Sequence, residues 1–339
     1  MTALDDRRRG VAGIGLGVGL ALFAALVAWQ GIGDVAATLR VAGAGLLLVA
    51  AFHLLPLFLD ALGWRALIPP GERPSAIEFA RGRWIGESVN SLLPVLQIGG
   101  SLARTGFLRR RGVAGGPAAA SVVVDVTLVV LSQVAFSLLG VVLLVAIKGG
   151  GRLGLAAAFG ALLMSGLGAG FWIAQRRGLF GAGGRALERF LEREEGPSIG
   201  LRAEEIDRSV AAIHADRAAM AGSFGWHLAS WVAGAGEVWL ALSFLGTPVG
   251  MSGALLLESL GQAVRAAAFA VPGALGVQEG GYVVLGGALG IPPDTCLALS
   301  LAKRSREILL GLPGLLAWRA EAALGRSTQA GRVATEEAP

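Results

Sequence analysis

The sequence has one cysteine, Cys296, and only three histidines among 339 residues. A single thiol excludes an intramolecular disulfide. Its neighbours are apolar, and His53, His214 and His227 lie too far apart to show the spacing of a metal site. The GxxxxGK[ST] pattern of a phosphate-binding loop is missing as well. We therefore expect no metal, no cofactor and no nucleotide-driven step.

Charge is also scarce: 16% of the residues are charged and 54% are hydrophobic, and the mean hydropathy is +0.65. The hydrophobic residues form uninterrupted runs of about twenty, which are typical of membrane spans and not of soluble domains. The pI near 10.5 does not indicate nucleic acid, because the arginines stand between the apolar runs, where they set membrane orientation.

The apolar runs predict an all-α polytopic membrane protein with about six spanning helices. A run of about twenty residues rising 1.5 Å each covers a ~30 Å hydrocarbon core. The first run follows Met1–Gly10 without a small-residue cleavage site, so we expect it to be retained. The expected spans are Val11–Trp29, Val41–Leu62, Ala118–Ile147, Leu153–Ile173, Ser223–Leu245 and Thr295–Trp318.

Two further apolar segments are interrupted by helix-breaking residues, near 83–112 and 254–289. The displacement that carries Pro94 onto Pro272 also carries Glu87 onto Arg265 and Asp125 onto Lys303, with the charges reversed. Interrupted segments at corresponding places in two halves indicate a transport site. We interpret them as re-entrant hairpins related by an inverted repeat. Two alternatives are chance recurrence in a glycine-rich chain and full crossing, which gives about eight spans. The residues that shape the breaks are Pro94, Gly99, Gly100, Pro272, Gly273 and Gly276.

Arginine and lysine predict the orientation. The segments 62–112 and 175–221 and both termini are rich in arginine, whereas three other connections hold only Arg40, Lys148 and Arg152. This asymmetry places both termini in the cytoplasm. We expect one membrane domain over 1–325.

Two parts of the chain are expected outside the bilayer. Ile206, Val210 and Ile213 recur at helical spacing among charged residues within 175–221, which predicts a cytoplasmic amphipathic helix on the membrane or on the bundle. The polar tail 326–339 is expected to be disordered.

Polar residues inside the apolar segments predict a water-filled cavity near the membrane midplane. Each charge there costs roughly 2.5–3.5 kcal/mol, so these groups must pair or face water. Arg104, Arg265 and Arg304 suit a phosphate or another anionic headgroup, and the nearby carboxylates would balance charge or relay protons. The predicted substrate-binding residues are Glu87, Asn90, Gln97, Arg104, Asp125, Glu258, Gln262, Arg265, Gln278, Glu279, Lys303, Arg304 and Glu307.

Structural roles are the alternative for several of these residues. Lys303 and Glu307, four residues apart, could neutralise each other within one helix. The stripe of Glu258, Gln262 and Arg265 could join helices, and Asp125 could bond to a neighbouring helix. Glu237 has no local partner in the sequence and is a further candidate for proton relay.

Two motifs resemble those of a known family. Asn90–Pro94 with Gly99, Gly100, Arg104 and the run Arg109–Gly112, followed later by Val271–Gly280 in the pattern PGxLGxxEG, is similar to the two signatures of the lysylphosphatidylglycerol synthase transmembrane region. This flippase-like family belongs to bacterial inner membranes, and the resemblance covers nearly the whole chain. The segments Arg83–Asn90 and Ser121–Asp125 resemble its hopanoid-biosynthesis branch.

The resemblance implies movement of a lipid between leaflets, with a hopanoid, glycolipid or aminoacyl-phospholipid as cargo. We expect only the translocating part of the full synthases here, without their aminoacyl-transferring domain. We expect a lipid translocase of the bacterial inner membrane, not an enzyme, with membrane lipids as ligands, no nucleic acid and lipid-biosynthetic enzymes as candidate partners. The alternatives are a scaffold of a lipid-biosynthetic complex and a membrane-embedded transferase.

Overall fold

A computed structural model describes residues 43–93, 98–149, 151–177, 199–268, 274 and 276–336. Every regular element in this part of the chain is a helix, as the apolar runs predict. The expected first span, Val11–Trp29, lies outside the described residues, and so do Pro94, Gln97, Pro272 and Gly273.

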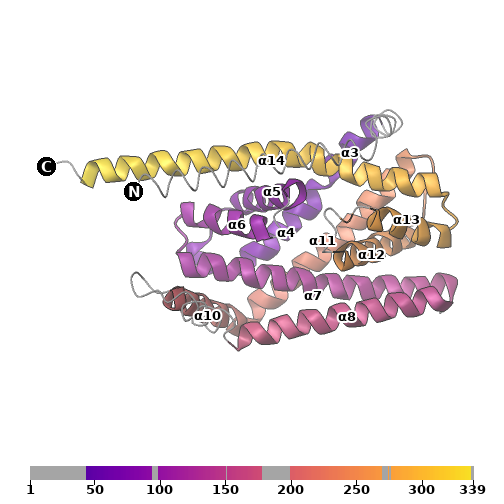
Figure 1. Ribbon diagram of the computed structural model, residues 1–339, viewed down its shortest axis with the longest axis horizontal. Coiled ribbons are helices and arrows are strands. Elements are labelled where there is room, and N and C mark those ends of the chain that lie inside the picture. Colours follow the sequence, from indigo (N-terminus) through magenta and orange to yellow (C-terminus); the bar gives the residue numbers. More distant parts are fainter. Residues whose placement is uncertain are drawn as a thin grey trace.

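The described helices form an elongated bundle. In Figure 1, α7 and α8 run side by side along one edge, α14 runs along the opposite edge, and α4, α5, α6, α12 and α13 lie between them. The helices are α3 Ala44–Phe52, α4 Leu54–Ala66, α5 Ala76–Leu92, α6 Ile98–Arg110, α7 Gly115–Lys148, α8 Gly151–Arg176, α10 Ile199–Ala215, α11 Arg217–Phe244, α12 Met251–Ala267, α13 Val277–Ala288 and α14 Pro293–Glu336, with a short 3-10 turn η1 at Pro70–Glu72.

Two stretches of the described chain have the length and hydropathy of a membrane span, Ala44–Ala66 and Gly115–Lys148. The first is interrupted at His53, which separates α3 from α4 where we predicted one continuous helix. Pro56 explains the interruption, because proline lacks the N–H that would bond the carbonyl of Phe52 and its ring crowds that carbonyl.

Large apolar side chains cover much of the outer surface. Leu47 on α3, Val142 on α7 and Leu162 on α8 are each more than 60% exposed. A soluble protein rarely exposes apolar residues over so many neighbouring elements, and such a surface is typical of a protein in contact with lipid.

The packing is similar in the two halves of the chain. α4 packs along α11 at the centre, α5 packs against α14, and α12 packs against α7. α5 also pairs with α6, and α12 pairs with α13. In Figure 1 the α5–α6 pair occupies the left half of the bundle and the α12–α13 pair the right half. Each half thus contributes a pair of short helices, one of which packs on the long helix of the other half.

Glycines allow the paired helices to approach closely. A Cβ atom on Gly100 of α6 would collide with the backbone carbonyl of Gly86 on α5 and lie 2.6 Å from Asn90 Cγ. Asn90 Oδ1 instead accepts a hydrogen bond of 2.8 Å from the Gly100 N–H. In the second pair, Gly261 of α12 faces the ring of Tyr282 on α13 in the same way. The predicted breaking residue Gly100 therefore acts here as a contact point between helices.

Within 175–221, where we predicted an amphipathic helix, the structure has α10. Ile206, Val210 and Ile213 pack into one cluster with Leu67 and Val124, so the apolar face of α10 lies on the bundle. At the other end of the chain, α14 continues beyond residue 325 to Glu336. The domain boundary predicted at 325 stays a prediction.

Candidate functional site

Side chains from seven helices, α4, α5, α6, α7, α11, α12 and α14, enclose a central cavity of about 350 Å³. Part of the lining is apolar and consists of Pro56, Leu57, Val126, Val129, Val130 and Trp231, with Gly86 and Gly234 beside them. The polar lining consists of His53, Asp60, Arg83, Glu87, Asn90, Ser91, Ser101, Arg104, Ser230, Glu237, Glu258, Gln262, Arg265, Arg306 and Glu307. The cavity can therefore hold a small polar group against fixed charges of both signs.

A first group of charges, the double-aspartate cluster, consists of Asp60, Arg83, Arg104, Asp125 and His227. Arg83 Nη2 lies 2.9 Å from Asp60 Oδ2, and Arg83 Nη1 lies 3.1 Å from Asp125 Oδ2. The other oxygens of the same carboxylates contact His227, at 2.7 Å for Asp60 and 3.0 Å for Asp125. Arg104 Nη1 adds a contact of 2.5 Å to Asp125 Oδ2. Arg83 and His227 thus bridge the two aspartates from opposite sides.

Neighbouring residues of α4 and α7 hold this cluster in place. Gly63 leaves room for the imidazole, since a Cβ at that position would lie 2.8 Å from His227 Cε1. Trp64 places its ring under the Arg104 guanidinium, with 4.9 Å to the ring centroid. Trp64 Nε1 donates a hydrogen bond of 3.2 Å to Ser121 Oγ, which anchors the indole to α7.

A second group, the double-glutamate cluster, consists of His53, Glu87, Glu237 and Arg306. The two nitrogens of His53 lie 2.9 Å from Glu237 Oε2 and 2.9 Å from Glu87 Oε1. Arg306 Nη1 lies 2.7 Å from both oxygens of Glu237 and 2.7 Å from His53 Nδ1. The partner that the sequence did not reveal for Glu237 therefore comes from α14 and from the junction of α3 and α4.

The two clusters join α4 and α11 reciprocally. His227 of α11 contacts Asp60 of α4, while His53 at the start of α4 contacts Glu237 of α11. The histidines and the carboxylates are thus exchanged between the two central helices, and each cluster contributes one histidine–carboxylate contact between them.

A third group links α12 and α14. Lys303 Nζ lies 2.5 Å from Glu258 Oε2, and Arg265 Nη1 lies 2.5 Å from Glu307 Oε1. The alternative in which Lys303 and Glu307 neutralise each other within α14 is therefore wrong. Lysine and glutamate four residues apart on this helix reach two different residues of α12. Gln262 Nε2 donates a bond of 2.8 Å to Glu258, as the polar stripe predicts.

The predicted substrate-binding residues divide into two sets. The first set lines the cavity and consists of Glu87, Asn90, Arg104, Glu258, Gln262, Arg265 and Glu307. The second set lies behind the lining or beside it and consists of Asp125, Gln278, Glu279, Lys303 and Arg304. Gln97 lies outside the described residues.

Glu279 and Arg304 pair with each other, and neither is among the residues that line the cavity. Arg304 Nε donates to Glu279 Oε1 at 2.8 Å, and the other oxygen of Glu279 accepts from the Gly276 N–H at 2.8 Å. Glu279 therefore caps the start of α13. Arg304 is not among the residues that line the cavity, and the headgroup role predicted for it stays a prediction.

Sequence reasoning missed several charged residues of the site. They are His53, Asp60, Arg83, His227 and Arg306, all within the two clusters. One signal was available, because His53 and Asp60 are seven residues apart and share a helix face. Arg83 and Arg306 are flanked by other charged or polar residues and resemble interfacial anchors in the sequence alone.

The charges around the cavity nearly cancel. The carboxylates of Asp60, Glu87, Asp125, Glu237, Glu258 and Glu307 face the cations of Arg83, Arg104, Arg265, Lys303 and Arg306. A buried charge without a partner is strongly destabilising, whereas a paired one is tolerated. Among the described residues no group of histidine, cysteine, aspartate and glutamate is arranged to hold a metal ion.

Comparison with known proteins identifies the family. The model of the lysylphosphatidylglycerol synthase TM region matches residues 15–314. The chain therefore belongs to this family of flippase-like integral membrane proteins. Searches of the curated proteins and of the solved structures find no match.

Proposed function

We propose that this member of the lysylphosphatidylglycerol synthase TM family is a lipid translocase that binds a polar or anionic headgroup in its central cavity. One observation carries the proposal: a cavity of about 350 Å³, lined by arginines and carboxylates from both halves, within a bundle whose outer surface is apolar. Buried charge of this density is costly in a membrane and is retained where a polar ligand must pass.

In the proposed membrane arrangement six helices span the bilayer, and the α5–α6 and α12–α13 pairs are re-entrant hairpins. α6 has 13 residues and α13 has 12, so each rises only about 20 Å, short of a ~30 Å hydrocarbon core. Figure 1 supports entry from opposite ends, since the two pairs occupy opposite halves of the bundle. Irregular backbone at this depth is tolerated where it borders an aqueous cavity.

An inverted repeat would relate the two hairpins. Arg83 of α5 contacts Asp125 of α7, whereas Glu258 of α12 contacts Lys303 of α14. Each of these pairs joins the first helix of a hairpin to the long helix that follows it. Asp125 and Lys303 occupy matching positions of the displaced sequence with opposite sign, and their partners Arg83 and Glu258 lie on corresponding helices without occupying matching positions.

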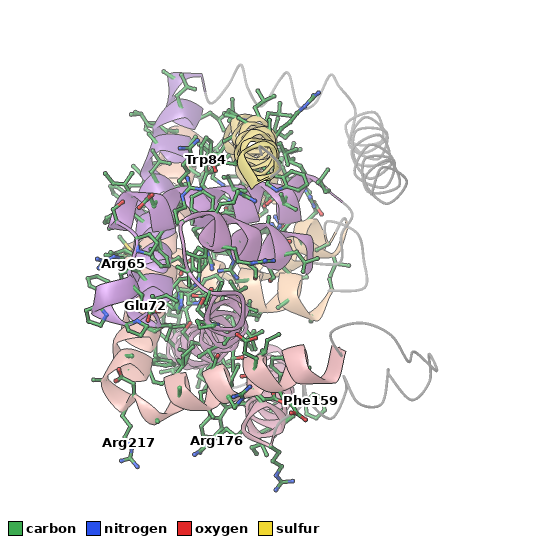
Figure 2. All side chains as sticks on the ribbon, turned by 90° about the vertical axis from the view of Figure 1, so that its left-hand side faces the viewer. Arg65, Glu72, Trp84, Phe159, Arg176 and Arg217 are labelled. Carbon is green, nitrogen blue, oxygen red and sulfur yellow. The ribbon has the colours of Figure 1, made fainter. Side chains whose placement is uncertain are left out.

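We also propose that the protein lies in the bacterial inner membrane, as the family resemblance implies, with both termini in the cytoplasm, as the distribution of arginine and lysine implies. Figure 2 views one end of the bundle, where Arg176 of α8 and Arg217 of α11 point outwards from the helices. Arginines at such helix ends mark the cytoplasmic side. We further propose that the protein is not an enzyme, that its ligands are membrane lipids, and that its cargo belongs to hopanoid or aminoacyl-phospholipid metabolism.

Exchange of a fluorescent phosphatidylglycerol between the leaflets of proteoliposomes tests the proposal. The variant Arg265→Gln/Glu307→Gln removes an ion pair of the cavity without leaving an unmatched charge. The matched control Arg111→Gln/Glu321→Gln removes an arginine–glutamate pair outside the cavity. We expect the first variant to slow exchange about tenfold, a change of ~1.4 kcal/mol in barrier, and the control to exchange like the wild type.

Other outcomes would overturn the proposal. Folded wild-type protein that leaves the leaflets unmixed would favour the scaffold, and equal exchange in all three proteins would remove the cavity from the mechanism. Chemical conversion of the added lipid by the purified chain would favour the transferase.

A further inference from the structure

His227 lies between two carboxylates and is fully buried. Its Nδ1 is 2.7 Å from Asp60 Oδ1 and its Nε2 is 3.0 Å from Asp125 Oδ1. The exposed fraction of the ring is 0%. Both distances are those of hydrogen bonds.

The two hydrogen bonds of His227 determine how many protons His227, Asp60 and Asp125 must hold together. An ionised carboxylate only accepts hydrogen bonds, and a neutral imidazole has one N–H to donate. Two bonds therefore need one hydrogen more than neutral His227 supplies. The count is the same whether that proton sits on the ring, as in imidazolium, or on one of the aspartates. The double-aspartate cluster holds one extra proton in this conformation.

The other charges around His227 are permanent. Arg83 from α5 and Arg104 from α6 contact the remaining oxygens of Asp60 on α4 and Asp125 on α7. Arginine stays protonated in proteins. The charged residues of α12 and α14 that line or back the cavity, Glu258, Arg265, Lys303, Arg304, Arg306 and Glu307, contact one another or Glu237 and Glu279 rather than His227. The two aspartates and two arginines sum to zero, so the extra proton makes the cluster net positive.

The contacts of His53 do not require an extra proton. Its Nδ1 faces Arg306 Nη1 at 2.7 Å as well as Glu237. An arginine N–H can supply the hydrogen there, and a neutral ring can then donate from Nε2 to Glu87. Of the two histidines, only His227 is enclosed by acceptors alone.

The cluster is in contact with the cavity. Asp60, Arg83 and Arg104 line it, and the side chain of Asp60 is 19% exposed. A proton from cavity water can reach the Asp60 carboxylate and, through it, Nδ1 of His227. The positive charge that it brings then lies at the wall that a headgroup would touch.

We propose that His227, Asp60 and Asp125 form a proton-binding site that couples proton movement to lipid movement. The inference rests on the proposed function. A proton bound at the double-aspartate cluster gives that cluster one net positive charge, which binds a headgroup with one negative charge. The loaded cluster is then neutral, and proton and headgroup leave together on the opposite side. The protein would act as a proton–lipid symporter for anionic phospholipids.

A pH gradient tests the coupling in proteoliposomes that contain a trace of fluorescent phosphatidylglycerol, with the membrane potential clamped at zero. One pH unit corresponds to about 1.36 kcal/mol, so an acidic exterior should enrich the probe in the inner leaflet about tenfold for one proton per lipid. Protein-free vesicles give the passive background. His227→Gln should abolish the enrichment, and the control His214→Gln, on α10, should keep it.

The outcomes separate this inference from the proposed function. If the protein exchanges the probe but gives no enrichment, or gives enrichment in the outer leaflet, the proton coupling is wrong and the proposed translocase function stands. If the protein produces no exchange at all, both the proton coupling and the proposed translocase function are wrong. Enrichment that persists in folded His227→Gln also overturns the site.

Nitrogen NMR of the three histidines decides the matter if His227→Gln does not fold. His53→Gln and His214→Gln assign two signals, and the third belongs to His227. At neutral pH we expect either a doubly protonated ring or a neutral ring that is hydrogen-bonded at both nitrogens, with the extra proton on an aspartate. A neutral ring with ionised aspartates would overturn the proposal.

Discussion

Lys303 Nζ lies 2.5 Å from Glu258 Oε2, and the exposed fractions of the two side chains are 2% and 4%. The pair joins α14 to α12 in the wall beside the cavity. Because both groups are almost fully buried, each depends on the other for its stability in the folded protein.

Removing one member of this pair should cost far more than removing both. Glu258→Gln or Lys303→Met alone leaves a buried charge without its partner, a loss of roughly 3–5 kcal/mol. The double variant leaves neither charge, so we expect its loss to be well below the sum of the single losses. Thermal unfolding of the purified proteins in detergent measures this. Additive losses in the double variant would show that the two residues do not depend on each other.

Much of the fold follows from residue patterns that act locally. The helices α7, α8 and α11 match the predicted apolar runs, because a run of about twenty apolar residues has few alternatives to a helix in lipid. The break at His53 was not predicted, although Pro56 was visible in the sequence. A proline near a helix start is often tolerated, and only its place relative to α3 shows that it divides this span.

The site could be predicted only in part. The polar stripe Glu258, Gln262 and Arg265 was recognisable because helical spacing puts these residues on one face. The partners were not, because Asp60 and His227 are 167 positions apart in the chain. Which buried cation meets which carboxylate depends on how helices from the two halves pack.

Because α5 and α6 approach closely, we expect alanine substitution at two glycines of α6 to have very different effects on stability. In Gly100→Ala the new methyl group meets backbone of Gly86 and the Asn90 side chain, and backbone cannot move aside cheaply. We expect destabilisation of at least about 3 kcal/mol, at the upper end for overpacking. At Gly106 the nearest atom is Arg110 Nη1 at 3.4 Å, the end of a flexible side chain. Gly106→Ala should be neutral or stabilising by up to about 1 kcal/mol.

The yield of monodisperse protein and its Tm measure both glycine variants. A Gly100→Ala protein as stable as Gly106→Ala would show that α5 and α6 are not in backbone contact.

An ion pair outside the predicted spans gives a pH dependence. Arg111 donates hydrogen bonds of 2.7 and 2.8 Å to the carboxylate of Glu321, and these bonds lower the pKa of Glu321. A carboxyl with a lower pKa in the folded state stabilises the protein above its unfolded pKa and loses that effect as the pH falls through its folded pKa. The pair should contribute about 1 kcal/mol at neutral pH.

Comparison of wild type with Glu321→Gln tests this dependence. The difference in Tm should be largest near neutral pH and should shrink as the pH falls below about 4.3, the ordinary value for glutamate. Glu72→Gln, on the exposed turn η1, serves as the control and should leave the profile unchanged. A Tm difference that stays constant across this range would rule out the pair as its source.

Two adjacent residues of α6 distinguish a wet cavity from a lipid-facing surface. Ser101 lines the cavity, whereas Leu102 is 68% exposed on the outer surface. In a Cys296→Ala background, a cysteine at either position is the sole thiol. Thiols react as thiolates, and water stabilises the thiolate whereas hydrocarbon suppresses it.

We therefore expect Ser101→Cys to react with a charged, water-soluble thiol reagent at least about tenfold faster than Leu102→Cys. A lipid-soluble maleimide should label Leu102→Cys as well, which shows that this thiol is present and intact. The measurement is the labelled fraction over time in reconstituted membranes, followed by mass spectrometry. Equal rates at both positions with the charged reagent would place Leu102 in water and contradict the membrane arrangement. Failure of the charged reagent to reach Ser101→Cys would show that the cavity is dry, and a dry cavity could not take a headgroup from the membrane surface.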